Sequence, residues 1–202
     1  MNEHARRQND QVIDRELIRK WLACGFFWLL LFPTVGVIMS TKFNYPEFLG
    51  DHPWFTFGRI RPIHVNGVIW GAFSTLFIGL CHYIVPRLCG VRLWNEHWSR
   101  GLVWVWNLNL AVAVVLLAAG WNRGWEAGEF ALINVVVIFL AMLVLTLQFL
   151  MTIRNLAGRF LPNSCHRPIM VPKKFWSTVQ TGMISIIEET MAIVSAQSAI
   201  GE

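Results

Sequence analysis

Two histidines are the residues in this sequence most suited to chemistry, because they lie in apolar surroundings. The chain contains six histidines, and only His64 and His82 fall within long apolar stretches. An ionisable side chain in such a stretch is costly, so each one is a candidate functional residue. The four cysteines form no C-x-x-C pair, which argues against a disulfide framework or a thiolate metal site.

His64 lies in the string F-G-R-I-R-P-I-H-V-N-G, which covers residues 57–67. Pro62 suits the first turn of a helix, where its missing N–H is not needed. His64 would then lie one turn inside the apolar stretch. Arg59 and Arg61 would stand at its aqueous rim, where the acidic groups of a bound ligand need positive partners.

A stripe of small residues follows His64 at a spacing of four. Its members are Gly67, Gly71, Thr75 and Gly79. Such a stripe lets a flat partner approach the backbone, and with an axial histidine and a basic rim it describes a heme b pocket. The same stripe is typical of helix–helix packing. Spacing alone favours packing, and both interpretations of Gly67 and Gly71 stay open.

His82 follows His64 by eighteen residues, which is five turns of a regular helix and about 27 Å. Both histidines are therefore expected on one helix face. The other apolar stretches contain no histidine, so a second heme ligand opposite His64 is missing from them. We expect His82 to be an interfacial anchor.

Other polar residues carry weaker signals. The sequence has no Gly-rich phosphate loop, no G-x-S-x-G and no H-E-x-x-H, and no catalytic residue is assigned. Glu126 and Glu129 are expected in a solvated loop. Amide side chains within apolar stretches are expected to bridge helices; these are Asn66, Asn107, Asn109, Asn134 and Gln148.

Four apolar stretches must position these residues. They cover about residues 21–40, 63–85, 101–119 and 130–153, and none contains Asp, Glu, Lys or Arg. About 20 such residues suffice to cross a bilayer. The expected fold class is an all-α, multi-pass transmembrane helical bundle with four spans. Its composition, 55% hydrophobic and 14% charged, is that of a membrane protein.

The positive charges predict an orientation. Thirteen of the 17 Lys and Arg residues flank the spans on the side of the N-terminus. The positive-inside rule places that side, and hence both termini, in the cytoplasm. Residues 1–20 are then a cytoplasmic tail. The net charge of +5 is explained by these residues that flank the spans, so no nucleic-acid partner is expected.

Residues 154–202 are expected to form a divergent C-terminal tail. Residues 183–200 are moderately apolar but carry Glu188 and Glu189 in the middle. Two adjacent carboxylates disfavour a fifth span. An interfacial or disordered tail is the favoured interpretation.

The motif around His64, together with Tyr83-Ile84-Val85 and Pro86-Arg87-Leu88-Cys89, resembles a known family. The chain is similar to the catalytic subunit I of cbb-type (C-family) heme–copper oxidases, and more loosely to the large subunit of nitric oxide reductase. The resemblance covers roughly residues 21–154, the first four helices of a longer subunit.

This resemblance implies a role for each residue of the motif. His64 would be one axial ligand of a low-spin heme b, and Arg61 would contact a heme propionate. Arg59 is a weaker candidate for the same rim. The family enzyme takes electrons from a cytochrome c, passes them to a high-spin heme and copper, reduces dioxygen and pumps protons. The resemblance also implies a multi-pass protein of the bacterial inner membrane.

The chain also departs from the family. The opposite heme b ligand, the high-spin heme ligand and the copper ligands lie in later helices that this chain lacks. Copper and high-spin heme are thus expected only in the complete enzyme. Expected partners are membrane lipid, other oxidase subunits including c-type cytochromes, and a second polypeptide or homodimer supplying the other ligand. A nitric oxide reductase-like subunit and a non-catalytic b-type heme protein or scaffold remain alternatives.

Overall fold

The computed structural model describes residues 12–50, 52–125 and 128–160, with side chains described as far as residue 155. The chain divides into two compact units, residues 1–156 and 157–202. The described secondary structure is helical: α2 (Arg15–Asn44), the 3₁₀ turn η1 (Pro53–Phe55), α3 (Phe57–Asn66), the π-helical segment η2 (Gly67–Phe73), α4 (Ser74–Cys89), α5 (Glu96–Ala119) and α6 (Leu132–Phe160).

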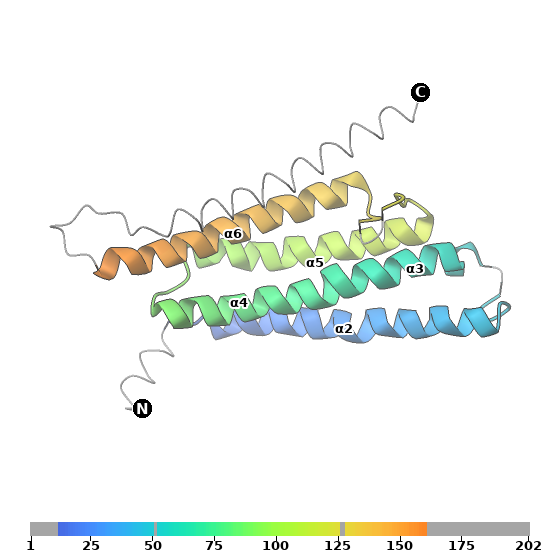
Figure 1. The fold of residues 1–202 in the computed structure, drawn as a ribbon, viewed down its shortest axis with the longest axis horizontal. Helices are drawn as coiled ribbons and strands as arrows, with labels where there is room; N and C mark the ends of the chain where they lie inside the picture. Colours follow the sequence, from blue (N-terminus) through green and yellow to red (C-terminus); the bar gives the residue numbers. More distant parts are fainter. Residues whose placement is uncertain (1–11, 51, 126–127, 161–202) are drawn as a thin grey trace, which may run out of the picture. The chain divides into compact units, whose positions relative to one another are not determined.

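Four of these helical stretches are long and apolar enough to cross a membrane. They are α2, the continuous run α3–η2–α4, α5, and α6 as far as Asn155. Successive stretches run in opposite directions and lie alongside one another (Figure 1). The expected all-helical fold with four spans is confirmed.

The helices extend beyond the apolar stretches. Helix α2 begins at Arg15, within the segment 1–20 that was expected to be a tail. Asp14 caps it, because its carboxylate accepts hydrogen bonds from the backbone N–H groups of Glu16 and Leu17, both at 3.1 Å. At the other ends, Gly90 and Gly120 adopt the left-handed conformation that stops α4 and α5.

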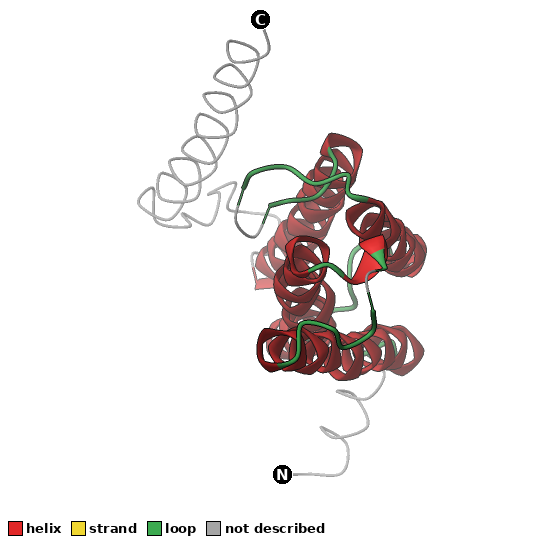
Figure 2. Cartoon of the chain, turned by 90° about the vertical axis from the view of Figure 1, so that its right-hand side faces the viewer, coloured by secondary structure: helices red, strands yellow, loops and turns green. Residues whose placement is uncertain are grey.

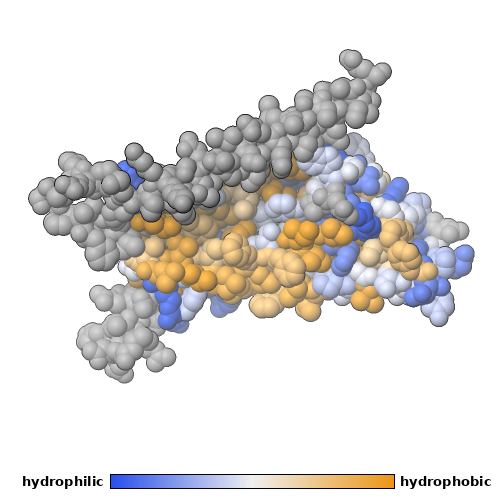
Figure 3. Space-filling model, viewed as in Figure 1, coloured by the Kyte–Doolittle hydropathy of each residue, from blue (hydrophilic) through white to orange (hydrophobic). Residues whose placement is uncertain are grey.

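Large side chains fill the interior between the helices. Trp21, Phe32 and Trp106 are almost fully buried. Other large apolar side chains face outward, among them Phe26, Leu30 and Trp104. Figure 3 shows apolar residues gathered along the helices of the visible face, with hydrophilic residues toward the ends. An outward apolar surface on hydrogen-bonded helices is what a bilayer requires.

Amide side chains bridge the helices, as expected. Asn107 accepts a hydrogen bond from the indole N–H of Trp28 at 2.6 Å. Asn134 donates to the side chain of Asn109 at 2.9 Å, which joins α5 to α6. Polar bridges of this kind supply specificity where the surroundings are apolar.

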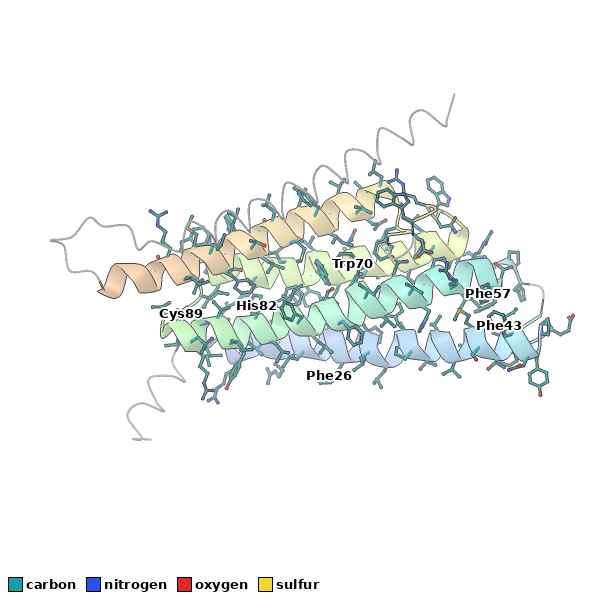
Figure 4. The ribbon with its side chains drawn as sticks, viewed as in Figure 1. Phe26, Phe43, Phe57, Trp70, His82 and Cys89 are labelled. Atoms are coloured by element: carbon teal, nitrogen blue, oxygen red, sulfur yellow. The ribbon has the colours of Figure 1, made fainter. Side chains whose placement is uncertain are left out.

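One end of the bundle holds the residues of the His64 motif. The end of α2, the start of α3, the end of α5 and the start of α6 meet there, and Figure 2 looks onto the connecting loops. The rings of Phe43 and Phe57 pack edge to face there, with centroids 4.9 Å apart (Figure 4). Their contact fixes the start of α3 against the end of α2.

Two expectations are not tested by this architecture. The tail is predicted to diverge over residues 154–202, and residues 161–202 lie outside the described part of the chain. The cytoplasmic location of both termini likewise stays a prediction.

Candidate functional site at the His64 end

His64 is held by helix α2 through one of its two ring nitrogens. Nδ1 lies 2.9 Å from the backbone carbonyl oxygen of Phe32. Because a carbonyl only accepts, Nδ1 carries a hydrogen, and in the neutral imidazole Nε2 then keeps its lone pair. Within the described residues, Nε2 has no hydrogen-bond partner, and the side chain is half-buried. A histidine that ligates a metal usually shows this arrangement, with the far nitrogen donating to a carbonyl.

The ring of His64 also lies directly on Gly36. A Cβ atom placed on Gly36 would lie 2.5 Å from Cε1 of the imidazole and 2.7 Å from Nδ1. Phe32 and Gly36 are one helical turn apart and therefore share a face of α2. We call Phe32 and Gly36 the histidine seat. Phe32 contributes its backbone carbonyl, and Gly36 contributes a Cα without a side chain.

Gly67 and Gly71 face protein rather than open space. A Cβ atom on either glycine would meet the ring of Phe32, at 2.5 Å in the case of Gly71. Farther along the stripe, Gly79 lies against Trp21 and Leu22 of α2. For a planar ligand to reach Gly67 or Gly71, the Phe32 ring would have to move. These contacts favour the packing interpretation of the stripe.

The two arginines of the motif are engaged at the same end. Arg59 donates to the carbonyl of Ala118 at 3.0 Å, near the end of α5. Arg61 forms an ion pair with Glu129 at 3.4 Å, and its side chain remains 39% exposed. Both guanidinium groups are therefore held by protein groups at this end of the bundle, and their role as a rim for acidic groups stays a prediction.

Glu129 is a member of this end that the sequence did not reveal. It was expected in a solvated loop, but it is 5% exposed. Its carboxylate accepts from Nδ2 of Asn66 at 2.5 Å in addition to Arg61. The backbone N–H of Arg123 donates to its carbonyl at 3.0 Å, which folds the loop inward.

A π-helical segment begins three residues after His64. It covers Gly67–Phe73, and the hydroxyl of Ser74 donates to the carbonyl of Ile69 at 2.8 Å just beyond it. Segments of this kind interrupt α-helices and are frequent at functional sites. The expectation that His64 and His82 share one helix face assumed a regular helix. In the structure His64 contacts Phe32 of α2 through Nδ1, whereas His82 contacts Ser99 of α5 through Nε2 while its ring stacks on Trp21 of α2.

His82 is a structural residue of the opposite half of the bundle. It is 2% exposed, lies between helices (Figure 4) and stacks on Trp21. Nδ1 contacts the carbonyl of Ile78 and Nε2 contacts the hydroxyl of Ser99, both at 2.7 Å. Ser99 in turn donates to Gln148 at 2.5 Å. The expectation of an interfacial anchor is wrong, because these partners bury the imidazole.

The donor set at the His64 end fits an axial heme ligand better than a site for a bare metal ion. The described residues contain no group of three or more His, Cys, Asp or Glu side chains able to hold an ion. A heme takes at most two donors from protein, because the porphyrin supplies the other four, and His64 would be one of those two. His64 has a nitrogen without a partner among the described residues, whereas Arg59 and Arg61 contact Ala118 and Glu129, and Gly67 and Gly71 do not line an open face.

Comparison with known proteins agrees with this architecture. The model of the family "Cytochrome C and Quinol oxidase polypeptide I" matches residues 16–198. The match covers most of the chain, so the chain belongs to that family. The match also runs past the range 21–154 over which motifs carry the resemblance.

Three relatives show how the chain compares with individual proteins. It is 29% identical over 114 residues to the cytochrome c oxidase subunit 1 homolog of Agrobacterium tumefaciens, covering 56% of this chain and 21% of that protein. It is 26% identical over 114 residues to the Cbb3-type cytochrome c oxidase subunit CcoN1 of Stutzerimonas stutzeri, covering 56% and 24%. The Azorhizobium caulinodans homolog matches over 181 residues at 29% identity, covering 78% and 33%. The chain thus spans about a fifth to a third of the length of these curated relatives.

Proposed function

We propose that this chain is the heme b-binding part of a terminal respiratory oxidase, with His64 as one axial ligand of a low-spin heme b. The observation that carries the proposal is the hydrogen bond from His64 to the Phe32 carbonyl at 2.9 Å. It fixes the tautomer in which Nε2 is free to ligate, in a chain whose family implies a heme cofactor.

The chain's own residues would divide the remaining tasks. Arg61, and more weakly Arg59, would neutralise propionates at the aqueous rim, since guanidinium groups form strong charge-assisted bonds with carboxylates. The apolar interior formed by Phe32 and its neighbours would keep water from the ligating nitrogen. When bound, the heme supplies a one-electron carrier.

The proposed activity requires parts that lie outside this chain. We infer that the second axial ligand comes from later helices of a complete subunit, from a second polypeptide or from a homodimer. Copper and the high-spin heme would belong to that complete assembly, with c-type cytochrome subunits as electron donors. We place it in the bacterial inner membrane with both termini cytoplasmic.

A cofactor-free scaffold is a second candidate function. The observation that favours it is the Phe32 ring, which fills the space beside Gly67 and Gly71 without any ligand. A heme spectrum separates it from the first proposal.

The test is a reduced-minus-oxidised spectrum of the full chain, purified from membranes alone and after co-expression with the remaining oxidase polypeptides. We expect a b-type band that His64→Ala abolishes and His52→Ala retains. His52 is the matched control, because it is exposed in the loop at the same end of the bundle. A band in the chain alone indicates ligation by two copies, and one seen only on co-expression indicates an external ligand. No band in either preparation supports the scaffold.

A further inference from the structure

Gly36 has no space for a side chain, because the His64 ring lies against it. A Cβ atom there would lie 2.5, 2.7 and 3.1 Å from Cε1, Nδ1 and Nε2 of His64. Real Cβ atoms essentially never approach heavy atoms within 3.0 Å. The three nearest atoms all belong to the imidazole ring, so any side chain at position 36 collides with the proposed ligand itself.

Phe32 completes the constraint from the preceding turn. Its carbonyl accepts the Nδ1 hydrogen at 2.9 Å, while its ring is fully buried against Gly67 and Gly71. The ring thus anchors the carbonyl that holds the histidine. The imidazole is therefore fixed by its contact with Gly36 and by its hydrogen bond to Phe32.

From these contacts we propose that Gly36 is a positioning residue that sets the orientation of the His64 imidazole and preserves its hydrogen bond to Phe32. The inference rests on the proposed ligand role of His64 and deepens it. A methyl group at position 36 would lift the half-buried ring away from α2. Because the ring is only half-buried, we expect it to shift rather than the helices, so that the fold is retained while the direction of Nε2 and the Nδ1 hydrogen bond change.

The expected consequence is a change in ligand strength rather than in helix packing. Losing the partner of a ligating histidine's far nitrogen typically weakens binding about 10- to 100-fold. We therefore expect Gly36→Ala to weaken heme retention by about that factor. It should also shift the g-values of the oxidised heme in electron paramagnetic resonance, because those values depend on imidazole orientation.

Two glycine variants provide matched controls. Gly25→Ala introduces an equally tight contact on the same helix, 2.7 Å from Leu76. Gly101→Ala lies on α5, where a Cβ atom would meet nothing within 4 Å. The proposal requires that Gly36→Ala alter heme retention and g-values while folded Gly25→Ala and Gly101→Ala do not. Equal behaviour of the three variants overturns it.

Two measurements report on the seat without heme. The nitrogen chemical shifts of ¹⁵N-labelled His64 distinguish the Nδ1–H tautomer from its alternatives, and Gly36→Ala should change them. In a double-mutant cycle, His64→Ala should remove the stability cost of Gly36→Ala, because the methyl then has space, and leave that of Gly25→Ala unchanged. Additive costs of Gly36→Ala and His64→Ala contradict the proposal. If Gly36→Ala alone fails to fold, the proposal requires that adding His64→Ala restore folding, and a double variant that also fails to fold contradicts it.

These measurements separate the two proposals. If the double-mutant cycle and the nitrogen shifts confirm the contact between Gly36 and His64 but the chain never binds heme, only the proposed function is refuted. A heme lost in His64→Ala but unaltered in Gly36→Ala refutes the positioning role alone.

Discussion

The environment of Glu129 shows how one buried carboxylate can organise the end of a bundle. Its two oxygens accept from Arg61 of α3 and from the buried amide of Asn66. Glu129 itself precedes α6, so the contacts connect the second and fourth spans. A charge buried to this degree is retained only when it is paired and hydrogen-bonded.

We expect Glu129→Gln to lower the free energy of unfolding by about 1–3 kcal/mol, because hydrogen bonds to a charged group are lost in a buried site. Thermal unfolding in detergent measures the effect. Arg61→Gln serves as the partner variant, and the double variant should cost less than the sum of the two. Strict additivity would show that the pair makes no net contribution.

The sequence revealed part of this site. His64, Arg59 and Arg61 stand in one contiguous motif, so their proximity could be predicted. Gly36 and Glu129 could not, because their importance comes from contacts with residues 28 and more positions away. A glycine carries no chemical signal of its own, and an acidic residue in a loop usually contacts water.

At the scale of elements, the join between α2 and α5 depends on Asp14. One carboxylate oxygen caps α2, and the other accepts two hydrogen bonds from Arg100, at 2.8 and 3.2 Å. Partial burial acts to raise the pKa of Asp14. The hydrogen bonds from Arg100 and from the backbone of α2 outweigh it and hold the pKa below its ordinary value.

A group whose pKa is lowered by folding stabilises the protein above its unfolded pKa and loses that contribution as pH falls through the folded value. Asp14→Asn should therefore cost about 0.2–1 kcal/mol at neutral pH, since Arg100 is half exposed. The difference should shrink below about pH 4. Asp14→Ala should cost about 1 kcal/mol more, because it also removes the cap. Thermal unfolding across pH measures both, and a difference that grows on acidification contradicts the assignment.

Helix existence was predictable, but helix limits and regularity were not. The apolar stretch 21–40 identified the first span, whereas α2 runs from Arg15 to Asn44. Charged residues such as Arg19 and Lys20 continue a helix once a cap has started it. The π segment at Gly67–Phe73 left no distinct pattern, because its glycines are equally typical of close packing.

At the scale of the whole molecule, the outer surface is apolar along the helices and polar at their ends. The predicted orientation follows from the unequal distribution of Lys and Arg between the two ends. It places the loop around Glu47 outside the cell membrane and the loop around Arg92 in the cytoplasm. Both residues are exposed.

Cysteine labelling tests this orientation. In a chain whose native cysteines are replaced by serine, Glu47→Cys should react with a membrane-impermeant maleimide in intact spheroplasts. Arg92→Cys should react only after permeabilisation. The opposite pattern would reverse the topology and move His64 to the cytoplasmic end.

Because the helix between His64 and His82 contains a π segment, we expect an added residue there to disturb the structure more than a substitution would. A substitution within residues 67–73 alters one side chain, whereas inserting one residue rotates all that follows by about 100°. The nitrogen of His82 would then turn away from Ser99 while His64 kept its contact with Phe32. Related chains should accordingly tolerate exchanges here but not insertions.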